Sequence, residues 1–194
     1  MDLSGFNLER LTPEKEILPF DCGDADLNEF LSSDSKNYSS QLLAVTYLLE
    51  NNQGLIAFFS VLNDKISVED VESGNRWKKI KVIFPKNKHF KSYPAVKIGR
   101  FAVSQQYKQH GLGTALLDYI KFLFIQNNRT GCRFITVDAY RQSLTFYEKN
   151  GFKYLTESDK EADTRLMYFD LSQITVQLSK GSFTPDTDNN QQLN

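Results

Sequence analysis

Hydrophobic and polar positions divide most of the chain into short strands and helices. Alternating or continuous apolar runs predict strands at residues 42–50, 55–62, 95–103, 133–139, 152–155 and 165–171. Apolar residues at three- and four-residue spacing predict a turn and helix within residues 20–31, capped by Asp24, and helices over residues 111–127 and 142–149. This order of elements predicts an α/β (α+β) fold.

The stretch at residues 71–93 interrupts this pattern. It is polar and basic and contains Pro85, so we expect mostly loop there, with residues 80–84 as a short strand or helix. We expect one domain over residues 1–175 and a polar tail at residues 176–194, which offers little to bury.

Composition narrows the class of protein. The chain has 194 residues, 40% hydrophobic and 24% charged, as expected for one globular domain. No apolar run approaches the roughly 18 residues that span a bilayer, and the start lacks the pattern of a secretory signal. Cys22 and Cys132 are far apart and lack metal-ligand spacing, so we expect neither a disulfide framework nor a metal site. A cytoplasmic protein without membrane contact is expected.

Charge is distributed unevenly along the chain. Residues 73–117 contain ten basic and no acidic residues, whereas the rest of the chain has 13 basic against 24 acidic residues. A basic face predicts contact with a polyanion, and Arg76, Lys78 and Lys79 are then candidate substrate-binding residues. A solvated lysine-rich loop is the simpler alternative.

A glycine-containing turn stands between a predicted strand and a predicted helix, at residues 107–114. Gly111 and Gly113 allow the backbone to approach a bulky anion, and the free N–H groups at the helix start favour phosphate. A dinucleotide-binding motif is excluded because a third spaced glycine and the downstream acidic residue are missing. A nucleotide-binding P-loop is excluded because Gly-Lys-Ser/Thr is absent.

Lys108-Gln109-His110-Gly111-Leu112-Gly113 resembles motif A of the GNAT acetyltransferase family, with lysine where arginine or glutamine is usual. The resemblance implies a mixed, mostly antiparallel twisted sheet of about six to seven strands, flanked by helices and splayed between the cofactor strand and the next. It implies acetyl-CoA as cofactor. Its diphosphate would bind at Lys108, Gln109, His110, Gly111, Leu112, Gly113 and Thr114, and its pantetheine arm along Phe101, Ala102 and Val103.

A second motif, Phe146-Tyr147-Glu148-Lys149-Asn150-Gly151-Phe152, follows Gly111 by 35 residues. Core packing explains Phe146 and Phe152. In GNAT enzymes, which this motif resembles, the tyrosine reaches the thioester sulfur, so Tyr147 is implied to be the general acid when an amine attacks the acetyl group directly. A backbone N–H of residues 101–103 would stabilise the oxyanion.

No convincing general base is found in the sequence. A lysine amine has a pKa of about 10.4, whereas an α-amine has a pKa of about 7.7–8.0 and is substantially neutral near pH 7. The missing base therefore favours an α-amine as acceptor.

The turn at residues 20–23, the segment 27–31, the strand at 94–103 and Val137-Asp138-Ala139 are similar to GNAT toxins of toxin–antitoxin systems. This resemblance implies acetylation of the α-amine of aminoacyl-tRNA, a homodimer and a ribbon-helix-helix antitoxin. The alternatives are an acetyltransferase of a small metabolite, peptide or protein amine, and a non-catalytic acyl-CoA-binding regulatory module. Tyr147 argues against the last, since a binding module needs no such phenol.

Three further residues allow two interpretations each. Arg100 either orders the acceptor or pairs with an acidic neighbour, and pairing is favoured. Asp138 either orients substrate or ends a strand, and the strand end is favoured. Trp77 either stacks on a base or is an exposed anchoring aromatic.

Overall fold

The computed structural model describes residues 3, 5–71, 77–78, 90–108, 110–126 and 131–179, with side chains described up to residue 175. Within these residues, a seven-stranded sheet has the order β1-β2-β3-β4-β5-β7-β6. Neighbouring strands are antiparallel except β4 and β5, which are parallel. The strands are β1 (Asn7–Arg10), β2 (Val45–Asn51), β3 (Gly54–Ser67), β4 (Ser92–Val103), β5 (Phe134–Tyr140), β6 (Lys153–Tyr154) and β7 (Thr164–Asp170).

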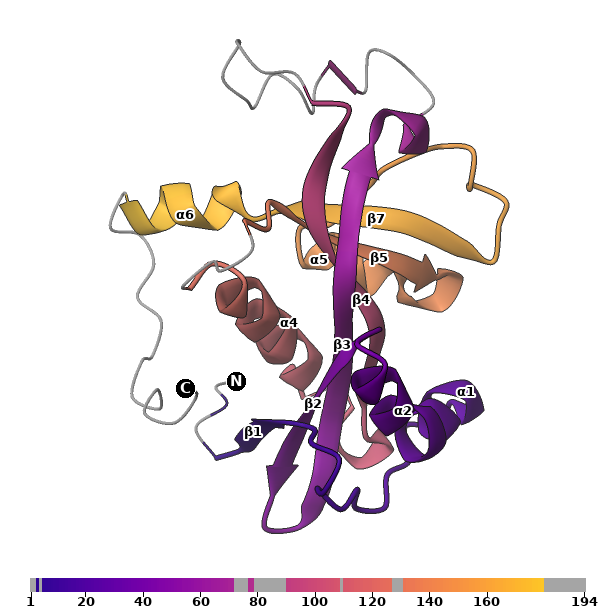
Figure 1. The fold of residues 1–194 in the computed structure, drawn as a ribbon, viewed down its shortest axis with the longest axis vertical. Helices are drawn as coiled ribbons and strands as arrows, with labels where there is room; N and C mark the ends of the chain where they lie inside the picture. Colours follow the sequence, from indigo (N-terminus) through magenta and orange to yellow (C-terminus); the bar gives the residue numbers. More distant parts are fainter. Residues whose placement is uncertain are drawn as a thin grey trace.

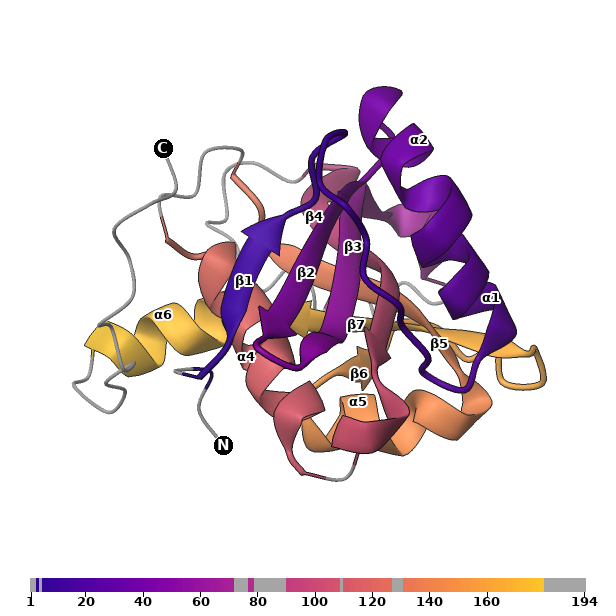
Figure 2. The same ribbon diagram turned by 90° about the horizontal axis from the view of Figure 1, so that it is seen from below.

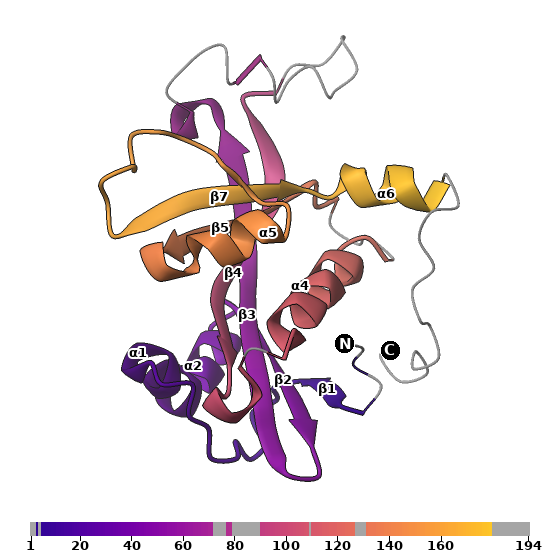
Figure 3. The same cartoon turned by 180° about the vertical axis from the view of Figure 1, so that it is seen from behind.

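Helices cover both faces of this sheet (Figure 1). Helices α1 (Ala25–Glu29) and α2 (Ser35–Ser40), joined by a π-helical turn, lie on one face. Helices α4 (Leu112–Leu123) and α5 (Leu144–Lys149) lie on the other, as the view from behind in Figure 3 shows. Helix α6 (Ser172–Ser179) follows β7 and crosses the predicted boundary at residue 175. The view from below in Figure 2 shows the sheet between these two layers.

Each layer has its own core. Under α4, the apolar stripe Leu112, Leu116, Leu117 and Ile120 packs on the sheet together with residues such as Ile135 and Val137. Under α1, Phe30 and Leu31 pack against Phe58 and Ala102. The Asp24 carboxylate caps α1 as predicted, because it accepts a hydrogen bond from the Leu27 N–H at 3.1 Å. The two cores hold β4 between them.

The predicted α/β class and the mixed, mostly antiparallel sheet are confirmed. The sequence pattern missed β1 and α6, and β3 extends to Ser67, beyond the predicted end at residue 62. Within the described residues, every helix is too short or too polar to cross a bilayer. In the same residues, no three His, Cys, Asp or Glu side chains are placed to share a metal ion.

Two interpretations of single residues are wrong. Trp77 is 4% exposed, and its ring lies 5.6 Å from that of Tyr93, so it is neither an exposed anchor nor free to stack on a base. Asp138 does not end a strand, because β5 continues through Tyr140 and Asp138 pairs in register with Leu166 of β7.

Candidate active site

The central strands β4 and β5 form a fork. They pair in parallel from Ala95↔Phe134 to Ile98↔Val137 and then separate. Beyond that point β4 continues to pair with β3, and β5 continues to pair with β7. The splay implied between the cofactor strand and the next is therefore present, and it opens a gap beside residues 99–103.

A β-bulge at Gly99 turns the end of β4. Ser60 pairs with Arg100, whereas Val61 pairs with Ile98, so Gly99 is the extra residue. A Cβ atom at Gly99 would lie 2.8 Å from the Leu62 Cδ2 atom, so a larger residue there would require the Leu62 side chain to shift. Because the bulge shifts the alternation of side chains by one, Phe101 and Val103 follow Val96 and Ile98 onto the α4 face.

The peptide groups of Phe101 and Val103 face the gap. The Ser104 N–H donates to the Ile56 carbonyl at 2.8 Å, and antiparallel pairing alternates, so Ala102 also bonds toward β3. Phe101 and Val103 then present N–H and C=O groups to the side that β5 has left. Ala102 is 4% exposed and packs in the core under α1, so its side chain does not border this gap.

A pocket of about 370 Å³ lies at this edge, on the side of α4 and α5. It brings the predicted glycine turn together with the predicted tyrosine. Its lining residues are Phe101, Val103, Tyr107, Lys108, Gly111, Gly113, Thr114, Ser143, Phe146 and Tyr147.

The glycine turn supplies donors for an anion. Gly111 has φ +75°, and a Cβ atom placed on it would have no neighbouring atom within 4 Å, so the backbone there is open to a ligand. The first bond of α4 runs from the Ala115 N–H to the Gly111 carbonyl at 3.1 Å, which leaves the N–H groups of residues 112–114 without a partner inside the helix. The positive end of α4 thus meets the pocket.

Gly113 gives this turn its close packing against α5. A Cβ atom at Gly113 would lie 3.3 Å from the Phe146 Cε2 atom and 3.8 Å from the Phe101 Cε1 atom. The rings of Phe101 and Phe146 are themselves 5.8 Å apart. A larger residue at position 113 would therefore push apart the two walls of the pocket.

Tyr147 lines the pocket from α5 with a side chain that is 6% exposed. Its ring contacts Phe146 at 5.2 Å and Phe152 at 5.3 Å between centroids. Burial raises the pKa of the phenol above its ordinary value, so the hydroxyl keeps its proton near neutrality. Among the described residues, none forms a hydrogen bond with this hydroxyl, which leaves it able to donate to a ligand in the pocket.

Lys108 borders the pocket, and its ammonium also binds protein. Nζ donates to the Cys22 carbonyl at 2.6 Å, which ties the glycine turn to the turn before α1. Gln105 strengthens the tie, since its Nε2 atom donates to Asp21 at 2.7 Å. These contacts fix the loop between β4 and α4 from the N-terminal side.

The other predicted site residues lie elsewhere or outside the described part. His110 is exposed and Leu112 is 1% exposed in the core, and neither lines the pocket. Arg100 pairs with Asp26 at 3.8 Å and lies 4.9 Å from the Phe30 ring, on the α1 face. Lys78 is exposed. Gln109, Arg76 and Lys79 lie outside the described residues.

Three lining residues were not predicted as site residues. Phe146 was assigned to core packing, and it does pack, but on the pocket side. Tyr107 donates to Gln53 at 2.6 Å, which anchors the β2–β3 turn to the glycine turn. The sequence signal that could have identified Tyr107 is its position next to Lys108, at the start of the glycine turn. Ser143 gave no signal in the sequence.

The family model of the acetyltransferase (GNAT) domain matches residues 43–154, more than half of the chain. The chain therefore belongs to the GNAT acetyltransferase family, a family of acetyl-CoA-dependent N-acetyltransferases. No curated protein sequence gives a significant match.

Solved structures of bacterial toxins share the fold. A bacterial toxin superposes with a TM-score of 0.72 at 17% identity, over 90% of this chain and 95% of its own. AtaT complexed with acetyl-methionyl-tRNAfMet superposes with a TM-score of 0.72 at 20% identity, over 89% of this chain and 99% of its own. A tyrosine-to-phenylalanine mutant of KacT superposes with a TM-score of 0.72 at 19% identity, over 89% of this chain and 99% of its own. At these identities the likeness shows the fold.

Proposed function

We propose that this protein transfers the acetyl group of acetyl-CoA to a primary amine in the fork between β4 and β5. One observation carries the proposal: a single pocket joins a glycine-opened helix start, a strand edge with free peptide groups, and a buried tyrosine. When bound there, acetyl-CoA supplies an activated acetyl thioester.

The pocket fits this coenzyme in three respects. The open backbone at Gly111 and the free N–H groups of residues 112–114 suit a diphosphate. The peptide groups of Phe101 and Val103 suit the amides of an extended pantetheine arm. The Lys108 side chain adds positive charge at the same edge. Gln109 and His110 belong to the same turn in the sequence, and their contribution to binding the diphosphate stays a prediction.

Tyr147 holds a proton at its hydroxyl and donates it to the leaving thiolate. Its burial keeps the phenol protonated, and its place on the pocket wall supports the role. A positioned general acid contributes on the order of 10²–10⁴-fold to rate. A non-catalytic acyl-CoA-binding module would not need a phenol at this position, so Tyr147 favours the enzyme.

For the acceptor, we infer the α-amine of aminoacyl-tRNA. The support is the fold shared with AtaT, whose structure holds acetyl-methionyl-tRNAfMet, together with the low pKa of an α-amine. AtaT also binds a C-terminal segment of the antitoxin AtaR. A homodimer and a ribbon-helix-helix antitoxin are the corresponding proposals for this chain. The basic residues Arg76, Lys78 and Lys79 are candidates to grip tRNA phosphates.

The test is incubation with labelled acetyl-CoA and a mixed pool of charged tRNA, with a protein mixture and polyamines as parallel acceptors. We expect label in the tRNA fraction that is released as N-acetyl amino acid by mild alkali. Label confined to polyamine or protein would assign the chain to the alternative, an acetyltransferase of a metabolite or protein amine. No label in any fraction would count against an acetyltransferase.

A further inference from the structure

Asp138 lies where the fork opens. The last registered pair of β4 and β5 is Ile98↔Val137, and Asp138 is the next residue of β5. Val137 and Ala139 are buried in the core under α4, so the Asp138 side chain between them points to the opposite face of the sheet. The coenzyme pocket and Asp138 therefore border the fork from opposite sides.

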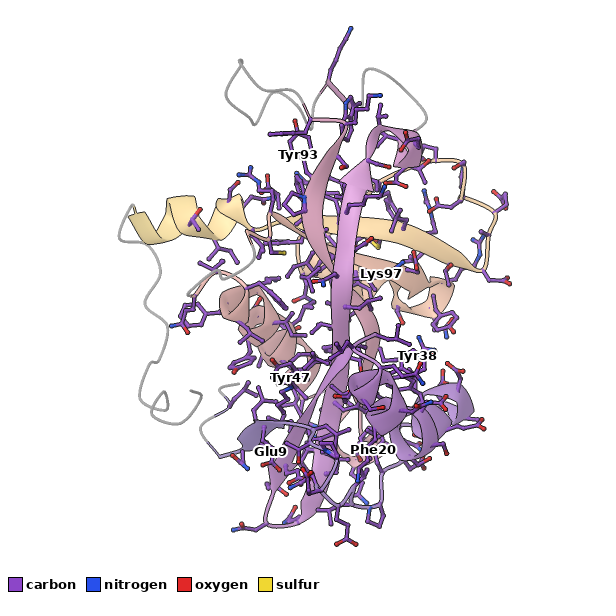
Figure 4. The ribbon with its side chains drawn as sticks, viewed as in Figure 1. Glu9, Phe20, Tyr38, Tyr47, Tyr93 and Lys97 are labelled. Carbon is purple, nitrogen blue, oxygen red and sulfur yellow. The ribbon has the colours of Figure 1, made fainter. Side chains whose placement is uncertain are left out.

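Lys97 of β4 forms an ion pair with Asp138 at this point. The pair is reached by solvent, since the side chains are 27% and 46% exposed. Figure 4 shows Lys97 near the middle of β4, far from Tyr93 at the beginning of the strand. A carboxylate at the middle of the central sheet thus holds a primary ammonium next to the gap.

Two other charged groups on this face, Asp64 and Arg100, are engaged by different partners. The Thr136 hydroxyl donates to the Asp64 carboxylate, and Arg100 pairs with Asp26 of α1 at 3.8 Å. Neither interaction involves Asp138. In the described part of the chain, Lys97 is the ion-pair partner of Asp138.

We propose that Asp138 binds the amine of the acceptor, and that the Lys97 ammonium occupies the same position until the acceptor arrives. The inference rests on the proposed acetyl transfer and adds the residue that holds the second substrate. Lys97 supports it chemically, because its Nζ atom is a primary amine of the kind that the reaction uses.

This position also assists the reaction. When a neutral amine attacks, its lone pair forms the C–N bond. Tyr147 protonates the sulfur as the C–S bond breaks, and the proton lost by the nitrogen returns to Tyr147 through water. The nitrogen becomes positive as the C–N bond forms, and a fixed carboxylate stabilises that charge more than it stabilises the free amine. Asp138 is thus an acceptor-binding residue whose effect is on kcat/KM for the amine.

Substitution of Asp138 and of Lys97 separates acceptor binding from a structural ion pair. Loss of a structural ion pair would have the same effect from either side, whereas acceptor binding by Asp138 predicts unequal effects on kcat/KM. In Asp138→Asn, kcat/KM for the acceptor falls by on the order of 100-fold, as for removal of one preorganised charge-stabilising group. In Lys97→Met, the competing ammonium is gone, and kcat/KM stays at or above the wild-type value. The acceptors are methionyl-tRNA and methionine methyl ester, and coenzyme A affinity is measured by calorimetry for each variant.

Asp138→Glu and Asp118→Asn are the controls. Glutamate keeps a carboxylate and recovers part of the rate. Asp118 is a matched case, 55% exposed and paired with Lys121 at 2.8 Å on α4, and its substitution leaves acceptor kcat/KM unchanged. Coenzyme A affinity close to wild type in Asp138→Asn shows that the fold is intact.

The inference is supported if Asp138→Asn loses more acceptor kcat/KM than Lys97→Met. It is overturned if the losses are equal, if Lys97→Met loses more, or if neither variant loses activity while the wild type is active. If the wild type acetylates neither probe, the acceptor that is labelled in the mixed pool takes their place. A wild type that labels no acceptor overturns the proposed function, and this inference with it.

Discussion

The two sides of the fork between β4 and β5 differ in how they are built. On the side of α4, the pocket presents backbone groups: the helix start after Gly111 and the peptide groups of Phe101 and Val103. On the side of α1, the fork is bordered by charged side chains, Lys97 and Asp138. A backbone-lined site depends on main-chain shape, whereas a site of side chains can change with each substitution. Under the proposed function, coenzyme binding is then set by the fold, and acceptor choice by a few residues.

Among the substitutions that test the shape and packing of the pocket, the largest effect is expected where the coenzyme side has least space. In Gly113→Val, the new side chain meets Phe146, since a Cβ atom alone lies 3.3 Å from its ring. Overpacking costs about 1–3 kcal/mol, and the same free energy lost from binding, as the pocket walls move apart, makes coenzyme A affinity weaker by about 5- to 150-fold. Calorimetric titration measures it. Gly5→Val is the control, because a Cβ at Gly5 meets no atom within 4 Å. Unchanged affinity in Gly113→Val would mean that the pocket walls need not be this close.

A second effect should come from the contact that joins α4 to α5. Lys121 is 5% exposed, and its Nζ atom donates to Asp118 at 2.8 Å and to the Asn150 carbonyl at 3.1 Å. Lys121→Met leaves that carbonyl without this donor, so we expect a loss of about 1–3 kcal/mol in the free energy of unfolding. Urea denaturation measures it against Lys153→Met, an exposed lysine. Equal stability of the two variants would show that α4 and α5 are held without Lys121.

The pH dependence of turnover tests the proton on the coenzyme side. Burial raises the pKa of Tyr147, so the phenol remains protonated at pH values where an exposed tyrosine, with a pKa of about 10, would lose its proton. With acceptor amine saturating, kcat should show no falling limb assigned to this phenol between pH 7 and 10. A decline in that window that is absent from the Tyr147→Phe variant would contradict the buried placement.

The smallest effect is expected on the other layer, in the turn between α2 and β2. Leu42 is 89% exposed and has φ +59°, a left-handed conformation that is strained for leucine. Leu42→Gly should raise the free energy of unfolding by about 0.5 kcal/mol, since the relief of strain exceeds the entropy cost of glycine. The expected shift in thermal midpoint is one or two degrees upward at most, with transfer activity unchanged. A lower midpoint would show that Leu42 makes a stabilising contact.

Much of the coenzyme side could be predicted from the sequence. Glycine spacing before a helix start leaves a local signal that indicates Gly111 and Gly113, whereas Tyr147 is indicated only by the resemblance of its motif to GNAT enzymes. The structure places all three residues on one pocket. Ala102 shows the limit of such reasoning, since alternation along a strand cannot reveal the bulge at Gly99 that decides which residues face the gap. Lys108 shows another limit, because its bond to the Cys22 carbonyl joins segments 86 residues apart.

The acceptor side was poorly predicted for a physical reason. The sequence favours a strand end at Asp138, because a polar residue after an apolar run gives the same pattern at a strand end and at a fork. Trp77 was expected at the surface among basic residues, whereas Tyr93, brought next to it by β4, buries it. In both cases the deciding partner comes from a distant segment.

In the proposed function, the buried phenol of Tyr147 beside the glycine turn serves the leaving group and does not serve coenzyme binding. The most direct measurement is Tyr147→Phe, assayed in one preparation for coenzyme A affinity by calorimetry and for acetyl transfer to methionyl-tRNA. We predict unchanged affinity and a kcat reduced on the order of 10²–10⁴-fold, the range expected for a lost general acid. Unchanged kcat in this variant, with wild type active, would contradict the claim.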